Sequence, residues 1–458
     1  MYSFLFFTDE VNEVAREEEM TFARNGTTFA GDADLEDVRL HQCIQVDIEA
    51  GFWNPTASQK RTRNFLQVTM AEKERPVVIK EEEVWSWGAG TDGQLGTGKL
   101  QDEHLPIQLH IGAGGGLVSV LSCGGAHVIA LTTGGRVVTW GRGNCGQLGH
   151  GDMVSSLQPK PVEFFEGFIV THVSAGWNHS GFVTDTGKLF TCGDGSFGQL
   201  GHGDCKSNSF PVMVSYFASR HVEQIACGMR HSLVLLEGHS GHRVYGFGSG
   251  KHGQLGISED KVGSICLPQT TTGLEDANIF GINANGDHSA ALSAEGCLYT
   301  WGRGFTGGSD VNNPQRLSSS LSFIQVALGW HHALLLTSEG EVYMLGGKHH
   351  GWLSESQRMN PVKHLSEGSK EVDLGKIPGL NGIKVLQIAA GAEHSALVTE
   401  KALVMTWGWG EHGQLGLGST VDQASPQVVK LEHRPPTIHS RTEVFCGSGF
   451  TFAVRHLK

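Results

Sequence analysis

A short glycine-rich tract recurs along this chain and constrains its fold more than any other feature. The fullest copies read WSWGAGTDGQLGTG from Trp85, TWGRGNCGQLGHG from Thr139, TCGDGSFGQLGHG from Thr191 and TWGWGEHGQLGLG from Thr406. A shorter copy, GFGSGKHGQLG, starts at Gly246, and looser copies start at Thr300 and Met344. Repetition at a regular period indicates units that pack on their neighbours rather than several unrelated domains.

A second tract, Gly-x-x-His, alternates with the first. Its histidines are His127, His179, His231, His288, His332 and His394, and Phe450 takes the same place in the last copy. The stretch from each histidine to the next WG reads as a β-hairpin, as in HVIALTTGGRVVTWG, where two apolar strands meet at Gly134-Gly135. A loop and a further strand precede the next histidine. Each unit therefore holds about four strands in roughly 50 residues.

Seven such units predict an all-β, seven-bladed β-propeller over residues 84–458. A small sheet of this kind cannot bury its faces alone, and radial packing gives each sheet two neighbours. The repeat begins in mid-unit, because Val84–Trp87 is a strand without its upstream hairpin partner. We expect this amino-terminal strand to complete the last blade, which closes the ring and removes two exposed edges.

Residues 1–83 do not share the repeat. They hold 17 acidic and 9 basic residues, and their scattered apolar residues follow no period. We interpret this segment as an acidic, disordered tail, in which Lys60–Arg63 is a weak candidate for a basic nuclear-import patch.

Composition narrows the classes of partner and compartment. The net charge is −13, which argues against direct nucleic-acid binding through a broad basic face. The sequence has no long apolar run and no secretory leader pattern, so we expect no membrane span and a nuclear or cytoplasmic protein that is not secreted. The nine cysteines form no CxxC pair and are interpreted as reduced thiols, several of them in the core.

The repeated residues are interpreted as architectural. Gly88–Gly93 fits the GxGxxG phosphate-loop pattern, but a polar loop follows where that site needs a helix. We expect the leucines of GQLG to fill the space between blades, Gln94 and its equivalents to bond turn backbone, and the tract histidines to bond backbone. The histidines have no partner at metal-ligand spacing, so we predict no metal, no cofactor and no catalytic residue.

Positions that vary inside a rigid repeat are the candidates for a specific surface. The two residues before each tract histidine vary freely, and exposed tryptophan and arginine there would be binding hot spots for a protein partner. The partner-binding candidates are Trp177, Asn178, Arg230, Asp287, Trp330, His331 and Glu393. Packing against neighbouring loops is the alternative role for these residues. A polar excursion, Ser354–Gly382, is a second candidate for a binding loop.

WGxGxxGQLGxG alternating with GxxHS, seven times over Val84–Lys458, resembles the regulator of chromosome condensation repeat family. The resemblance implies a seven-bladed propeller, and it brings two known functions into view. One is guanine-nucleotide exchange on the small GTPase Ran, which uses acidic face residues and a β-wedge. Asp287 lies in a matching Gly-Asp-His setting, but the early blades carry no wedge insertion.

The other is ultraviolet-B reception, which uses tryptophans of Gly-Trp-Arg-His-Thr motifs on consecutive blades. Here the matching tryptophans, Trp177 and Trp330, are three blades apart, with Met229 and Gly286 between them. We do not expect the receptor's cluster to form. The sequence therefore favours a non-enzymatic scaffold that binds a protein, such as a small GTPase or a chromatin-associated protein, through one face. Exchange-factor and photoreceptor activity are the alternatives.

Overall fold

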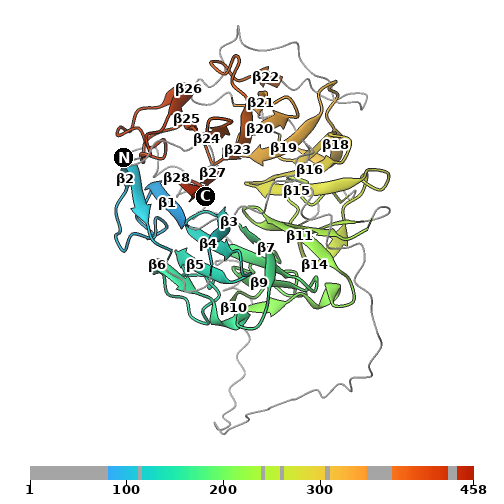
Figure 1. The fold of residues 1–458 in the computed structure, drawn as a ribbon. Coiled ribbons are helices and arrows are strands. Elements are labelled where there is room, and N and C mark those ends of the chain that lie inside the picture. The colour runs from blue at the N-terminus through green and yellow to red at the C-terminus, as the bar shows by residue number, and fades with distance from the viewer. Residues whose placement is uncertain are drawn as a thin grey trace, which may run out of the picture. The chain divides into compact units, whose positions relative to one another are not determined.

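The computed structural model describes residues 81–457 except 112–115, 239–242, 258–262, 305–309, 348–373 and 432–440. These residues form seven four-stranded antiparallel sheets arranged around a common centre (Figure 1). The all-β propeller and its seven blades are therefore confirmed. Residues 1–80 of the predicted tail lie outside the described residues, whereas its last three residues, Glu81–Glu83, belong to strand β1 (Glu81–Gly88) and not to a disordered segment.

Six blades are built from consecutive strands, each numbered from the centre outward. The first three are β3 (Val118–Cys123), β4 (His127–Thr132), β5 (Val137–Gly141) and β6 (Ser156–Pro161); β7 (Val170–Ala175), β8 (His179–Thr184), β9 (Leu189–Gly193) and β10 (Asn208–Met213); and β11 (Val222–Cys227), β12 (His231–Leu236), β13 (Val244–Ser249) and β14 (Ser264–Thr270). The next three are β15 (Ile279–Asn285), β16 (His288–Ser293), β17 (Leu298–Gly302) and β18 (Val311–Arg316); β19 (Phe323–Leu328), β20 (His332–Thr337), β21 (Val342–Gly346) and β22 (Leu374–Lys376); and β23 (Val385–Ala390), β24 (His394–Thr399), β25 (Val404–Gly408) and β26 (Gln423–Val428). Two short 3₁₀ helices, η3 (Glu163–Phe165) and η4 (Ser215–Phe217), follow β6 and β10.

The seventh blade joins the two ends of the propeller. Its order is β27 (Arg441–Cys446), β28 (Phe450–Leu457), β1 (Glu81–Gly88) and β2 (Glu103–Leu109), again from the centre outward. β1 pairs with β28 along its whole length, from Glu81 opposite Leu457 to Gly88 opposite Phe450. Ring closure by the amino-terminal strand is thus confirmed, with β2 added outside it. The strand begins at Glu81, three residues before the start of the repeat.

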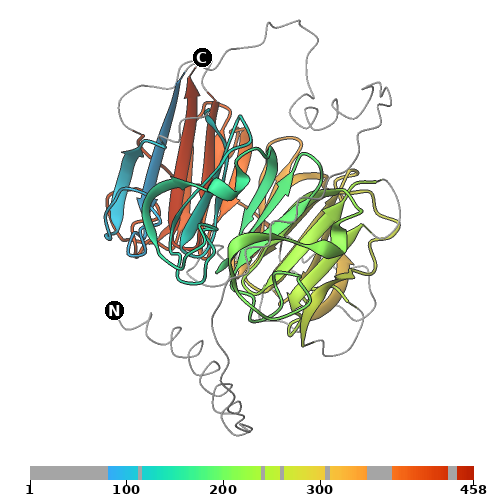
Figure 2. The same cartoon turned by 90° about the horizontal axis from the view of Figure 1, so that it is seen from below.

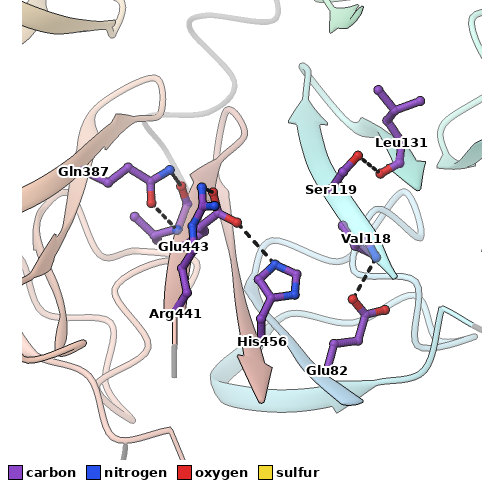
Figure 3. A network of polar contacts seen from close by, with 9 residues as sticks. Glu82, Val118, Ser119, Leu131, Gln387, Arg441, Glu443 and His456 are labelled. Atoms are coloured by element: carbon purple, nitrogen blue, oxygen red, sulfur yellow. Dashed lines mark hydrogen bonds and ion pairs between the residues drawn. The ribbon is translucent and has the colours of Figure 1, made fainter. Parts of the chain in front are cut away.

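Polar contacts accompany this closure (Figure 3). The Glu82 carboxylate accepts a hydrogen bond of 2.7 Å from the Val118 amide of the next blade, although burial raises the pKa of Glu82. Within the closing blade, Arg441 Nη2 lies 2.7 Å and His456 Nε2 3.3 Å from the Glu443 carboxylate. These contacts hold the ends of β1, β27 and β28 in register.

The middle strands of each blade are the most deeply buried. All six residues of β4 (HVIALT) and of β12 (HSLVLL) are buried, whereas no residue of the outer strand β6 is buried. A continuous apolar run is typical of a strand that is covered on both faces. The blades' own neighbours supply that cover, as Figure 2 shows from the side. The innermost strands contact one another in turn around the ring.

Glutamines tie these innermost strands together. Gln387 Nε2 donates to the Val444 carbonyl at 3.0 Å, and its Oε1 accepts from the Val444 amide at 2.8 Å (Figure 3). Gln325 makes the same pair of bonds to Ile388. A side chain of one blade thereby satisfies backbone groups of the next that would otherwise be buried without partners.

The GQLG tract links successive blades as the sequence indicated. Gln94 Oε1 accepts from the Asp92 amide, and the Gln94 carbonyl accepts a 2.9 Å bond from Trp140 Nε1 of the next blade. Leu95 is fully buried in one cluster with Trp140. Gly96 has a φ of +74°, and a Cβ at this position would lie only 2.9 Å from Nε1 of the Trp140 indole. The predictions for the glutamines and leucines are confirmed.

The tract histidines form a second set of links, with a different partner from the one predicted. His179 Nε2 lies 2.9 Å from Ser232 Oγ of the next blade, and Ser232 Oγ donates to the Gln199 carbonyl at 2.8 Å. The hydroxyl proton is therefore used, and Nε2 must be the donor to Oγ. His127 bonds Ser180 and His394 bonds Thr451 in the same way. The acceptor is a hydroxyl, which the sequence places directly after the next tract histidine.

Two sites depart from this rule, and at each of them the residue at the serine position of the next blade has also changed. Where Phe450 replaces the histidine, the next blade carries Val128 in place of serine, and both pack in one apolar cluster. Where Ala333 replaces serine, His288 Nε2 bonds the Trp330 carbonyl instead. The Nε2 of His288 therefore bonds backbone, as the sequence analysis expected of the tract histidines.

Candidate partner-binding face

The residues chosen from the sequence lie on one side of the ring. The Asn178 carbonyl accepts from the Asp194 amide, and the Arg230 carbonyl accepts from the Ser249 amide, each at 2.8 Å. The loops between the first and second strands are thus bonded to the ends of the third strands. We call the side formed by these loops, and by the loops between the third and fourth strands, the tract face.

On this face, backbone hydrogen bonds join the tracts of neighbouring blades around the centre of the ring. We call these bonds the belt and the opening that they surround the channel mouth. The Trp177 amide donates to the Gly228 carbonyl, and the Met229 amide donates to the Gly286 carbonyl, at 3.1 and 2.9 Å. Trp330 donates to Ala392 on the other side of the mouth. Side chains that stand on this belt are held by main chain on both sides, so their positions are fixed before any partner arrives.

Trp177 and Trp330 meet at the mouth of the channel. Trp177 follows β7 and Trp330 follows β19, three blades apart, yet their ring centroids are 5.4 Å apart with an angle of 50° between the rings. Their spacing along the chain did not predict this contact, and Met229 and Gly286 hold the corresponding positions on the two blades between them. The channel mouth is narrow enough for two large side chains from nearly opposite blades to reach each other. Both rings remain partly exposed.

Glycines make room for this pair. A Cβ on Gly125 would lie 2.8 Å from Trp177 Cε3, and a Cβ on Gly286 would lie 3.3 Å from Trp330 Cδ1. Each indole therefore rests over the tract of the preceding blade, where a larger residue would displace it. Beneath the pair, a cavity of about 330 Å³ is lined by the ends of the innermost strands.

Arginine side chains lie over aromatic rings at two places on this face. The Arg142 guanidinium lies 5.8 Å from the centre of the Trp177 ring, and Arg142 Nε lies 3.8 Å from the Asp92 carboxylate. The Arg230 guanidinium stacks over Phe197 at 4.6 Å. Such cation–π contacts hold long arginine side chains in place, which lowers the conformational entropy lost when they bind.

Asp287 anchors a charged cluster beside Trp330. It lies in the two-residue turn between β15 and β16, and Gln254 Nε2 donates to Asp287 Oδ1 at 3.2 Å. His252 and Arg303 each approach its carboxylate at 3.9 Å, and the side chain is 15% exposed. This acid is positioned by neighbours from two blades and keeps one edge toward solvent.

The remaining candidates are more occupied by local contacts. His331 Nδ1 lies 3.3 Å from the Glu393 carboxylate of the next blade, and both side chains are less than a third exposed. Asn178 is partly buried, and its backbone carbonyl accepts a hydrogen bond from the Asp194 amide. The structure therefore brings together Trp177 and Trp330 as one centre, with Asp287 beside Trp330.

Comparison with known proteins places the chain in a family. The family model described as the RCC1-like domain matches residues 84–453. The chain belongs to the RCC1-like domain family. It is 30% identical over 377 residues to the ultraviolet-B receptor UVR8 of Arabidopsis thaliana, covering 80% of this chain and 82% of the receptor. It is 30% identical over 399 residues to the secretion-regulating guanine nucleotide exchange factor of Mus musculus, covering 82% of this chain and 84% of that protein.

A solved structure agrees with this RCC1-like fold. Human WBSCR16 is 26% identical and has a TM-score of 0.68, with 82% of this chain and 99% of that chain covered. The relatives thus include a receptor and an exchange factor on one architecture. Because relatives with different functions share this fold, the function of a member is argued from the residues of its site and not from the fold.

Sequence reasoning missed several side chains of this RCC1-like face. Arg142 and Arg303 occupy the variable position of W-G-x-G, and Phe197 and His252 precede the Gly-Gln-Leu of their tracts. The variability of these positions was the available signal. The amides of Arg142 and Arg303 donate hydrogen bonds to the loops before the tract histidines. Phe197 and His252 lie in loops between third and fourth strands, which belong to the same face.

The remaining expectations from the sequence concern a loop, a metal site and a membrane span. Most of Ser354–Gly382 lies outside the described residues. Among the residues that are described, no group of three or more His, Cys, Asp or Glu side chains is placed to hold a metal ion. No helix in the described ranges has the length and apolar character that crossing a bilayer requires.

Proposed function

We propose that this RCC1-like propeller is a non-enzymatic scaffold that binds a protein partner through its tract face, in the nucleus or the cytoplasm. The observation that supports the proposal most strongly is the Trp177–Trp330 pair, partly exposed and 5.4 Å apart at the centre of the face. Tryptophan and arginine dominate the energetic centres of protein interfaces. Here Arg142 lies over Trp177, and Arg230 is stacked on Phe197 on the same face. The partner class is a small GTPase or a chromatin-associated protein.

The rigidity of the face supports the same function. Backbone bonds fix the loops that carry both tryptophans, and the arginines are stacked on aromatic rings. A surface that is already ordered loses little conformational entropy on association, so more of the contact energy contributes to affinity.

The test is affinity capture with the full chain, compared with the variant Trp177→Ala/Trp330→Ala. The matched control is Leu386→Ala, which removes a side chain that is 57% exposed at the start of β23, away from the tract face. We expect the double variant to lose its partners at least about tenfold while the control keeps them. Equal capture by all three proteins would overturn the proposal.

Guanine-nucleotide exchange on a Ran-type small GTPase is a second candidate. It is favoured by Asp287, an acid held on the tract face, and by the relative whose name is secretion-regulating guanine nucleotide exchange factor. The full chain should then accelerate release of fluorescent GDP, and Asp287→Asn should lose that acceleration. Asp185→Asn, in the loop after β8, is the charge-matched control. No acceleration by correctly folded protein would exclude this candidate.

Ultraviolet-B reception is a third candidate, favoured by the contact between Trp177 and Trp330 and by the arginine over Trp177. A receptor of this kind would change its oligomeric state under ultraviolet-B light. Gel filtration of the full chain before and after irradiation tests this directly, with Trp330→Phe as the comparison. An unchanged elution volume in the wild type would exclude the candidate.

A further inference from the structure

Two cysteines from neighbouring blades lie side by side at the outer part of the tract face. Cys205 belongs to the loop between β9 and β10, and Cys266 lies near the start of β14. Their Sγ atoms are 2.8 Å apart. Cys205 is exposed, so small oxidants in solution reach it directly. Among the described cysteines, this pair differs from Cys192 and Cys227, which are buried.

The backbone around the pair holds the two sulfurs close. The Gly203 amide donates a 2.8 Å hydrogen bond to the carbonyl of Cys266 itself, which fixes the loop of Cys205 against β14. Gly198 packs on the same strand, and a Cβ there would lie 2.7 Å from Cys266 Cα. A disulfide needs about 2.05 Å between its sulfurs, so the bond requires less than about 1 Å of approach.

The difference in exposure between the two cysteines gives each sulfur a role. Burial raises the pKa of Cys266 to about 11, and the hydrogen bond to Cys205 and the nearby Asp204 act in the same direction. Cys205 is exposed and Cys266 is only partly exposed, so Cys205 is the sulfur that an oxidant in solution reaches first. Burial raises the pKa of Cys227 to about 12, which disfavours reaction there.

We propose that Cys205 and Cys266 form an oxidation site that closes into a disulfide between two blades, with a low-molecular-weight disulfide such as oxidised glutathione as the oxidant. The Cys205 thiolate attacks one sulfur of glutathione disulfide, forms a mixed disulfide and releases one glutathione thiolate. Cys266 then loses its proton to solvent and attacks the Cys205 sulfur, which releases the second glutathione. Two protein thiols are oxidised by two electrons, and one glutathione disulfide is reduced to two thiols.

The consequence is a covalent link across a junction that is otherwise held by packing and hydrogen bonds. The loop of Cys205 continues the tract that contains Phe197, on which Arg230 of the next blade stacks. The disulfide thus joins the same two blades that supply this arginine and its aromatic support. It places a redox-dependent link at the edge of the tract face.

The experiment uses the full chain, first reduced and then incubated with oxidised glutathione. Non-reducing peptide mapping by mass spectrometry should find the Cys205 and Cys266 peptides linked, with the loss of two hydrogens and of two reactive thiols. Cys266→Ser should stop at a glutathione adduct on Cys205. Cys205→Ser should give neither the link nor an adduct on Cys266, and Cys145→Ser should behave as the wild type.

Two results would overturn the proposal. One is a folded protein, by circular dichroism, in which Cys205 and Cys266 both stay reduced when glutathione oxidises other cysteines. The other is an adduct that persists on Cys205 in the wild type without closing onto Cys266. Either would show that the sulfurs do not approach to bonding distance in solution.

Discussion

The buried tract histidines make the stability of this propeller depend steeply on pH. Burial lowers the pKa of His127, His231, His332 and His394 to about 3 and that of His179 to about 4, from 6.5. The folded state keeps these rings neutral, while the unfolded chain protonates them below pH 6.5. The unfolded state therefore binds more protons in this window, and stability falls as pH falls from about 6.5 toward 4.

The size of the effect follows from the same shifts. At pH 5 each neutral buried histidine costs the folded state about 2 kcal/mol relative to the unfolded chain. Five such rings approach about 10 kcal/mol, which is comparable to the whole stability of an ordinary domain at about 5–15 kcal/mol. Lowering the pH from 7.5 to 5 should therefore remove most of the free energy of unfolding.

The assay is urea unfolding of the full chain, followed by tryptophan fluorescence between pH 7.5 and 5. The slope of the free energy against pH should correspond to uptake of at least about five protons near pH 5. His179→Gln keeps an N–H donor for Ser232 but does not titrate, so it should reduce that uptake by about one proton. A free energy of unfolding that is equal at pH 7.5 and pH 5 would refute the reasoning.

Three further predictions concern the links between blades. Ser232→Ala removes the acceptor of the His179 N–H and should lower the free energy of unfolding by about 1–3 kcal/mol in urea titrations; no change would show that the bond contributes nothing. Gly176→Ala would place a Cβ 2.5 Å from His179 Cε1 and should cost about 1–3 kcal/mol in the same assay, whereas a neutral effect would mean that the ring has room to move. Phe450→His and Val128→Ser should each destabilise the protein, and the double variant should recover at least about 1 kcal/mol of their summed cost, because the missing histidine–serine link is restored. Additive effects in that double-mutant cycle would contradict the assignment.

The sequence was sufficient for the architecture because each unit repeats the same local chemistry. The tract W-G-x-G fixes the end of a third strand, and Gln94 and Leu95 have the roles that their recurrence indicated. Ring closure followed from a repeat that begins in mid-unit. The charged residues Glu81–Glu83 gave no such signal, yet they pair with β28, where Arg455 Nη1 lies 3.5 Å from the Glu83 carboxylate.

The site was less predictable, because its geometry comes from the ring as a whole. Spacing along the chain puts Trp177 and Trp330 three blades apart, and no local pattern states how narrow the channel mouth is. The glycines that receive the two indoles, Gly125 and Gly286, belong to other blades. The partners of Asp287 also come from elsewhere, since His252 precedes it by one blade. Contacts of this kind depend on radial packing rather than on sequence period.

The measurement that tests the central claim most directly is site-specific photo-crosslinking of the full chain in its host cells. A benzophenone amino acid is placed at Met229, on the tract face at the channel mouth, or at Leu386, at the start of an innermost strand away from that face. The proposed function predicts discrete protein adducts from position 229 that disappear when Trp177 and Trp330 are both alanine, and none of these adducts from position 386. Adducts from position 386 alone, or adducts from position 229 that persist without the tryptophans, would contradict a partner bound through this face.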